Sequence, residues 1–228
     1  MSGRPLPRAL IVIVLFVAGF GCATPGQVGS GRTRNVDLAA LARAGTLRFP
    51  GRTVTPLTDG ARTGAHISAA QDEGAAWIEG VELETGTIEL DVKGKDVLQQ
   101  SFLGIAFAGL NDSTYEAVYV RPFNFAATDT IRKIHAVQYV SQPAYTWQRL
   151  RAERPEVFEN PVNPVPDPNG WVRLRLEIEP ASVRIFVGEG SEPDLVVDRL
   201  GDRRGRRIGL WLGFASDGDY ANLRITPR

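Results

Sequence analysis

The feature that most constrains the fold is a period-two alternation of apolar and polar residues, clearest between Trp171 and Glu179. Arginines and glutamates occupy every second position there, and apolar residues occupy most positions between them. The apolar residues inside this segment are Val172, Leu174, Leu176 and Ile178. Such an alternation indicates an antiparallel strand with one face on a core and the other in solvent.

Further segments of the chain also predict strands, and turn residues separate many of them. These segments are 87–93, 102–107, 115–121, 182–187, 208–214 and 221–226. Because many short strands with turns between them are typical of a sandwich or a barrel, we expect an all-β antiparallel sandwich. One or two short helices accompany it: residues 38–43, with Asn35 or Asp37 as the cap, and a stretch near residues 145–153.

Residues 123–169 break the strand rhythm and predict a long connection that ends in a proline-rich run. Long connections in compact domains are commonly functional when they are ordered. Aromatic and polar residues are interleaved in this one, so we expect an ordered loop packed over the sheet.

The first residues are typical of a secretion signal. Arg4 and Arg8 precede an apolar run at residues 9–20. That run is shorter than the roughly 20 residues that a membrane-spanning helix needs. We therefore expect a signal peptide at residues 1–21.

Cys22, the only cysteine, resembles the lipid-modified cysteine of a bacterial lipoprotein. Gly21 suits that pattern, whereas Gly19 and Phe20 depart from it. The expectation is a lipid anchor in the cell envelope, facing the periplasm or the cell surface, with a tether at residues 22–34. The alternative is cleavage after Ala23, which gives a secreted or periplasmic soluble protein.

The mature part, residues 35–228, is expected to be one domain. It has no further cysteine, so its core must stabilise it without disulfides. Of the 26 lysines and arginines, Arg4 and Arg8 lie in the signal peptide, so 24 basic residues stand against 26 acidic ones. This balance gives no electrostatic footprint for nucleic acid.

Two sets of segments carry a resemblance to known families. Residues 170–178, 183–187, 209–213 and 221–225 resemble the closing strands of laminin-G-like and 3-keto-disaccharide-hydrolase-type domains, which belong to the concanavalin A-like lectin/glucanase superfamily. Residues 86–92, 101–107 and 119–124 resemble the middle strands of family 16 glycoside hydrolase-like proteins. The resemblance covers roughly residues 65–228 and implies a jelly-roll sandwich. It implies no single activity, because this fold hosts lectins, hydrolases, lyases and adhesion modules.

The segment Glu89-Leu90-Asp91-Val92-Lys93 resembles the catalytic strand of family 16 glucanases. By that resemblance Glu89 matches the nucleophile and Asp91 its helper, with the acid about 5–5.5 Å from the nucleophile in a retaining enzyme. Lys93 stands at the acid position and cannot take that role, so His135 becomes the candidate proton donor. The alternative is an outward strand face on which Glu89 or Asp91 pairs with Lys93 or a neighbouring arginine.

A second group joins tyrosines, amides, an arginine and a histidine. Its members are Tyr119, Arg121, Asn124, His135, Gln138 and Tyr139. Tyrosine stacks on sugar faces, and the others form directional hydrogen bonds with hydroxyls. We predict that they line a saccharide site together with Trp147 and Trp211, and that Tyr119, Arg121 and Trp211 are partly exposed in one pocket. The alternative is a buried network that pins the long connection to the sheet.

Asp217 and Asp219 offer oxygen ligands of the kind that calcium uses, but two carboxylates fall short of its roughly 6–8 ligands. An ordinary turn is expected there, with no metal and no cofactor. The sequence as a whole favours an exported protein that binds a glycan or glycoside. The alternatives are a glycoside hydrolase or 3-keto-glycoside-cleaving enzyme, and a structural envelope module without a small ligand.

Overall fold

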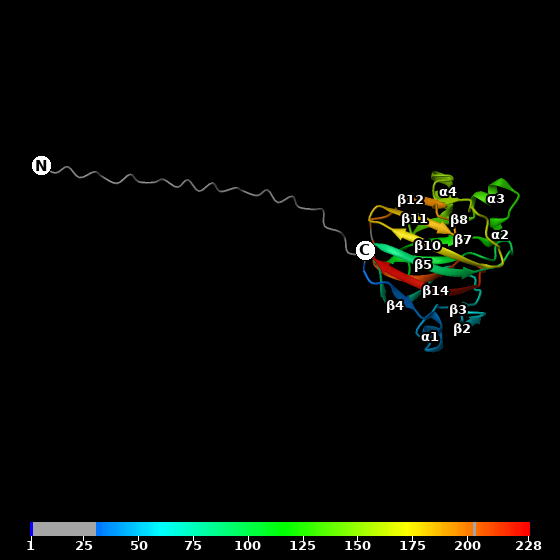
Figure 1. The fold of residues 1–228 in the computed structure, drawn as a ribbon. Coiled ribbons are helices and arrows are strands. Elements are labelled where there is room, and N and C mark those ends of the chain that lie inside the picture. Colours follow the sequence, from blue (N-terminus) through cyan, green and yellow to red (C-terminus); the bar gives the residue numbers. More distant parts are fainter. Residues whose placement is uncertain (2–30, 203) are drawn as a thin grey trace.

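The computed structural model describes residue 1, residues 31–202 and residues 204–228. The predicted signal peptide, Cys22 and most of the predicted tether lie outside the described residues. Two antiparallel sheets packed face to face form a sandwich (Figure 1). The predicted all-β antiparallel sandwich is therefore confirmed. None of the helices in the described part of the chain is long and apolar enough to cross a membrane.

The larger sheet has eight strands. Its order is β12 (Leu195–Asp198), β11 (Ser182–Val187), β10 (Trp171–Ile178), β5 (Gly86–Lys93), β14 (Gly218–Pro227), β3 (Arg62–Ile67) and β2 (Val54–Asp59), and β1 (Arg34–Val36) pairs with β14. The smaller sheet has six strands, in the order β4 (Gly74–Glu82), β13 (Arg207–Leu212), β6 (Leu103–Gly109), β7 (Tyr115–Val120), β8 (Val137–Gln142) and β9 (Glu159–Asn160).

The core lies between the two sheets and follows from the alternation. In β10 every second residue is buried, as the pattern predicts. These residues meet inward-facing residues of the other sheet, such as Ile105, Val118 and Leu210, in one apolar cluster. Removing this apolar surface from water is the main favourable term that holds the sheets together. A direct hydrogen bond also crosses between the sheets, from the Tyr220 hydroxyl to the Trp211 carbonyl at 2.7 Å.

The described residues form four short helices, where one or two were expected. They are α1 (Leu38–Arg43), α2 (Pro122–Phe125), α3 (Thr130–Ile134) and α4 (Trp147–Glu153). The predicted helix at residues 38–43 is confirmed, and Asp37 is its cap because its side chain accepts a hydrogen bond from the Ala40 amide at 2.8 Å. Figure 1 shows α2, α3 and α4 gathered beside β7 and β8, at the opposite end of the molecule from α1.

Two expectations about the chain's organisation need correction. Residues 123–169 are not a single long loop, because they include β8, a full strand of the six-stranded sheet that pairs with both β7 and β9. The domain also begins before residue 35. The Gly31 amide donates to the Pro227 carbonyl at 2.7 Å, and Arg34 pairs with Ile225 in β1.

Candidate functional site

A cleft of about 590 Å³ opens on the outer face of the six-stranded sheet. Its floor belongs to β7 and β13, and its walls come from α2, α3, α4 and the connection between β5 and β6. The strands supply the floor because the residues that alternate with the buried core positions of β7 and β13 project away from the core. Chain segments distant in sequence therefore meet around one hollow.

The floor is organised by a row of residues that lie directly opposite one another across five strands. The order is Trp211, Gly104, Tyr119, Gln138 and Glu159. Directly opposed residues project from the same face of a sheet. Because Gly104 has no side chain, the rings on either side of it come together, and the Trp211 and Tyr119 rings stack with centroids 4.4 Å apart and planes at 23°.

Arg121 follows β7 and forms hydrogen bonds with three neutral acceptors. Its guanidinium donates to the His135 carbonyl at 2.8 Å, to the Tyr119 hydroxyl at 3.1 Å and to Oε1 of Gln138. Tyr119 in turn donates to the same Gln138 oxygen at 3.0 Å. These contacts fix the arginine in one orientation at the edge of the floor.

The helices α2 and α3 add a second arginine to the wall. Arg132 Nε donates to Oδ1 of Asn124 at 3.2 Å, and its guanidinium also contacts the Phe123 carbonyl. Asn124 Nδ2 donates to the His135 carbonyl at 3.2 Å. Asn124 therefore connects Arg132 to the backbone that also holds Arg121.

Glu159, at the end of the cross-strand row, is 3% exposed and ion-paired. Arg151 of α4 donates to both of its carboxylate oxygens, at 3.0 and 2.8 Å. The His135 Nδ1 lies 2.7 Å from Oε2 of Glu159. Burial lowers the pKa of His135, against the opposing effect of the Glu159 charge, so the imidazole is predominantly neutral at pH 7.

The exposed mouth of the cleft has apolar residues beside polar ones, the latter being Glu73, Gln99 and Gln148. Trp147 is half-buried, and the Arg151 guanidinium lies 4.9 Å from its ring centroid. Phe214 is 54% exposed and Leu98 is 56% exposed. Phe102 lies between mouth and floor, with its ring centroid 6.4 Å from that of Tyr119. An entering ligand therefore finds apolar ring surface at the mouth and hydrogen-bonded polar groups deeper in the cleft.

No family model matches the chain, and no curated protein matches it. Among solved structures, the carbohydrate-binding module CBM66 from Bacillus subtilis is 14% identical, with 77% of this chain and 95% of that chain covered and a TM-score of 0.49. A Bacillus subtilis protein of unknown function with a galectin-like fold is 13% identical, with coverage of 76% and 86% and a TM-score of 0.49. Domain 4 of AbnA, an extracellular GH43 arabinanase from Geobacillus stearothermophilus solved in complex with arabinotriose, is 12% identical, with coverage of 77% and 76% and a TM-score of 0.44. At these TM-scores an assignment of function depends on the cleft itself.

The structure brings most of the predicted binding residues together. Those that line the cleft are Tyr119, Arg121, Asn124, His135, Trp147 and Trp211, and Gln138 joins them through its hydrogen bonds. The expectation that Tyr119, Arg121 and Trp211 are partly exposed is wrong, because their exposed fractions are 2%, 5% and 2%. The alternative of a network that pins the connection to the sheet also describes these residues, since Arg121 holds the His135 carbonyl.

Tyr139 was expected in the same site, but its side chain lies on the other face of β8. Consecutive strand residues point to opposite faces, so Gln138 lies on the cleft side and Tyr139 on the core side. The Tyr139 hydroxyl donates to Oε2 of Glu116 at 2.8 Å and accepts from the Leu200 amide at 3.0 Å. With no exposed surface, it does not line the cleft.

The predicted catalytic carboxylates lie on the other sheet. Asp91 of β5 is 2% exposed and accepts hydrogen bonds from Arg62, Arg173 and Asn222 at 3.2, 3.1 and 2.7 Å. Burial alone would raise the pKa of Asp91, but these hydrogen bonds outweigh it and lower the pKa. The structure therefore separates Asp91 from the cleft and pairs it with arginines, as the alternative interpretation of this strand expects.

The neighbours of Asp91 on β5 are also paired. Glu89 contacts Arg224 at 3.2 Å, and Lys93 contacts Asp59 at 2.7 Å. Of the predicted catalytic residues, only His135 lies at the cleft.

The two aspartates considered for calcium are each engaged with a side chain. Asp217 lies 2.7 Å from Lys95, and Asp219 lies 2.7 Å from Nδ1 of His66. The described residues contain no group of three or more histidine, cysteine, aspartate or glutamate side chains that could hold a metal ion.

Sequence reasoning missed Arg132, Arg151 and Glu159. One signal was available for Arg151, which follows Trp147 by four residues in a segment predicted to be helical, and residues at that spacing share a helix face. Glu159 carried no comparable signal, because its role depends on the pairing of β9 with β8.

Proposed function

We propose that the domain binds a glycan or glycoside in the cleft on the six-stranded sheet. The observation that carries the proposal is the convergence of aromatic rings and directional hydrogen-bonding groups in one cleft of about 590 Å³. Small-molecule sites are hollows of roughly 300–1,000 Å³ with apolar walls and a few placed polar groups. Sugars present both a C–H face and a rim of hydroxyls, so they suit this combination.

The polar groups of the cleft are held in place before any ligand arrives. Arg121 and Asn124 are both fixed on the His135 carbonyl, and Arg151 is fixed on Glu159. Preorganised groups lose little conformational entropy on binding, which favours affinity. Trp147, at the mouth, offers a large, half-buried ring to a sugar face.

Binding to a panel of neutral and acidic oligosaccharides, measured by isothermal titration calorimetry, tests this proposal. Trp147→Ala should weaken the binding of any ligand found by about tenfold or more, because the contact between the C–H face of the sugar and the aromatic ring is lost with the side chain. Trp171→Ala is the matched control, since Trp171 is also half-buried but lies on β10 in the other sheet. Equal losses for both variants, or no binding to any saccharide, would count against the proposal; the second result would favour a structural module.

A second candidate function is cleavage of a glycoside, and one observation favours it. His135 lies 2.7 Å from the buried carboxylate of Glu159, and a carboxylate that orients an imidazole is a common arrangement for proton transfer. On this hypothesis His135 transfers the proton and Glu159 holds the imidazole in position, while Glu89 and Asp91 take no part. His135→Asn should then abolish turnover of a bound glycoside or 3-keto-glycoside while binding persists. Turnover that survives this change would remove the enzyme candidate.

We also propose that the protein is exported and lipid-anchored through Cys22. The support is the short apolar run before the single cysteine. In a bacterial host, Cys22→Ser should move mature protein out of the membrane fraction or leave unprocessed precursor. Unchanged fractionation and processing would instead support cleavage after Ala23.

A further inference from the structure

Arg121 is a buried cation that contacts no carboxylate among the described residues. It is 5% exposed, and its three hydrogen-bond acceptors are a carbonyl, a hydroxyl and an amide oxygen. Burial lowers the pKa of Arg121, but a guanidinium remains protonated in proteins. A buried charge normally requires a paired opposite charge, because its desolvation is otherwise costly.

Arg132, which is half-buried, also forms no ion pair with the described residues. It contacts Asn124 and the Phe123 carbonyl, and no carboxylate among the described residues lies within ion-pair distance of it. The two arginines face the same cleft. Two cationic side chains that form no ion pair with the described residues therefore line one hollow, whose lining also includes the exposed carboxylate of Glu73.

Arginines that are shielded from solvent and form no ion pair are unusual within the described part of the chain. Most arginines there contact a carboxylate, as Arg62 and Arg173 contact Asp91 and Arg224 contacts Glu89. The arginines that contact none are solvent-exposed, except Arg121 and Arg132. The arginines that are shielded from solvent yet unpaired thus occur only at the cleft.

The floor also has more hydrogen-bond donors than acceptors. Gln138 uses its Oε1 to accept from Tyr119 and Arg121, and its Nε2 is buried with no hydrogen-bond partner among the described residues. Arg121 uses one N–H group of Nη1 and both N–H groups of Nη2 in its hydrogen bonds, so its Nε–H and the second Nη1–H have no acceptor among the described residues. Glu159, the buried acceptor nearby, is already occupied by Arg151 and His135. The missing partner is an acceptor that carries negative charge.

We propose that the cleft recognises an acidic saccharide, a sugar whose carboxylate is the counter-charge for Arg121 and Arg132. The inference rests on the proposed saccharide-binding function. A carboxylate suits the site because it carries the missing negative charge and has two oxygens that can accept charge-assisted hydrogen bonds from guanidinium N–H groups. The apolar residues of the mouth, Trp147, Phe214 and Leu98, contact the ring, and the carboxylate lies deeper, toward the arginines.

The test compares uronate oligosaccharides with their methyl esters, which keep the ring and remove the charge. Oligomers of galacturonate, glucuronate and mannuronate, their esters and neutral oligosaccharides of equal length are titrated into the full chain. At least one uronate should bind about tenfold or more tightly than its ester, as expected when a hydrogen-bonded charge is removed. Raising the ionic strength should weaken the binding of the acid more than that of the ester.

Arg132→Gln should remove most of the preference for the acid and leave the affinity for the ester almost unchanged. Arg132 is the residue of choice because it is only half-buried, so its replacement perturbs folding less than that of Arg121. Arg154→Gln is the matched control, since Arg154 also lacks a carboxylate partner but is exposed and does not line the cleft. This variant should bind like the unchanged protein.

The outcomes separate the inference from the function on which it rests. Esters or neutral sugars that bind as tightly as the acids, with Arg132→Gln without effect, overturn the acidic-saccharide inference and leave saccharide binding intact. Preference for sulfated over carboxylated sugars overturns the carboxylate assignment. Binding to no saccharide of either kind overturns both the inference and the proposed function.

Discussion

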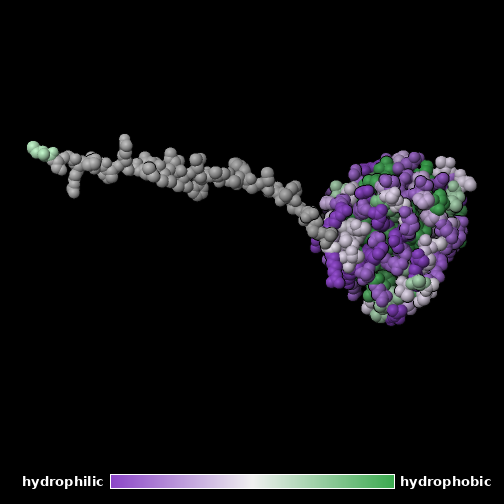
Figure 2. Space-filling view, viewed as in Figure 1, coloured by the Kyte–Doolittle hydropathy of each residue, from purple (hydrophilic) through white to green (hydrophobic). Residues whose placement is uncertain are grey.

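The outer faces of the two sheets carry the same kinds of charged residue but differ in whether these residues form ion pairs. On the eight-stranded sheet, Glu89, Asp91 and Glu177 each contact at least one arginine. β10, β5 and β14 of this sheet lie toward the viewer in Figure 1, and the same view in Figure 2 is largely hydrophilic. Charges of both signs alternate along this face and neutralise one another.

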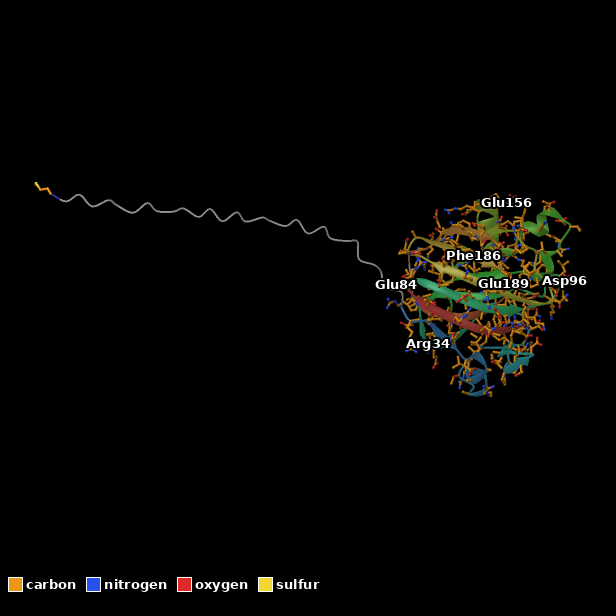
Figure 3. All side chains as sticks on the ribbon, viewed as in Figure 1. Arg34, Glu84, Asp96, Glu156, Phe186 and Glu189 are labelled. Carbon is orange, nitrogen blue, oxygen red and sulfur yellow. The ribbon has the colours of Figure 1, made fainter. Side chains whose placement is uncertain are left out.

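An aromatic residue that projects from this face is also covered by cations. Phe186, labelled in Figure 3, lies opposite Arg175 on the neighbouring strand and is 2% exposed. The Arg175 guanidinium lies 3.5 Å from its ring centroid, and that of Arg184 lies 5.5 Å away. The two arginines therefore leave almost none of this ring open to a ligand.

The outer face of the six-stranded sheet differs in both respects. Trp147, Phe214 and Phe102 leave apolar ring surface at a cleft. Arg121 and Arg132 contact no carboxylate in the part of the chain that the structure describes. The presence of charged residues alone therefore does not indicate a binding site. What distinguishes the two faces is whether each buried or half-buried charge already has its partner.

The largest expected effect on stability is at the outer face of the eight-stranded sheet, where the charged residues are paired. Asp91→Ala leaves Arg62 and Arg173 without their carboxylate in a partly buried network, so it should lower the free energy of unfolding by about 3 kcal/mol, the lower end of the cost of breaking a buried ion pair. Urea denaturation measures this. Saccharide binding per folded molecule should not change, because the residue lies on the other sheet.

The exposed pair of Glu84 and Arg206 provides the control for Asp91. Their side chains are 70% and 58% exposed, so Glu84→Ala should have little effect on unfolding. A loss of binding in folded Asp91→Ala protein would contradict the separation of the two faces.

A second, somewhat smaller effect is expected at Gly104, in the centre of the cleft floor. A Cβ there would lie 2.0 Å from the Val118 carbonyl oxygen and 2.6 Å from the Tyr119 Cα. Both atoms are backbone and can move only if the strands shift, so Gly104→Ala should lower stability by about 2 kcal/mol. It should also weaken saccharide binding, because the Tyr119–Trp211 stack is displaced.

Gly74 is the matched glycine for this experiment. It lies on β4 of the same sheet, and a Cβ there would meet only the Phe49 ring at 3.4 Å. Gly74→Ala should therefore be far less destabilising in thermal unfolding followed by circular dichroism. Similar melting temperatures for the two variants would show that the close packing of Gly104 against the backbone of β7 is not needed for stability.

The fold was predictable where one strand face is buried and the other is polar. β10 is the best example, because arginines and a glutamate alternate with apolar residues from Val172 to Ile178. β8 was not predicted, since buried polar residues such as Gln138 and Ser141 remove the contrast between its faces. Its identity as a strand depends on partners, β7 and β9, that the sequence alone does not reveal.

The site was predictable as a set of residue types and not as a geometry. Tyr119, Arg121 and Asn124 were found because they are close in sequence and chemically suited to sugars. The assignment of Glu89 and Asp91 rested on resemblance to a catalytic strand, and period-two spacing does not say which sheet a strand joins. Tyr139 was misplaced because β8 was taken as part of a loop, where the alternation rule has no force.

The smallest effect expected is a pH dependence of stability that originates at the cleft. The folded protein lowers the pKa of His135 chiefly by burial, whereas the unfolded chain has the ordinary value near 6.5. As the pH falls through that value, the unfolded state binds a proton that the folded state does not, so stability decreases as the pH drops until the folded pKa is reached. His135→Asn should remove this slope, which urea denaturation at a series of pH values between about 7.5 and 5 can measure. Identical slopes for the two proteins would mean that the charge of Glu159 fully compensates the effect of burial on the pKa of His135. At acidic pH a protonated His135 would then pair with Glu159, and the cleft would hold one more paired cation than the comparison of the two faces implies.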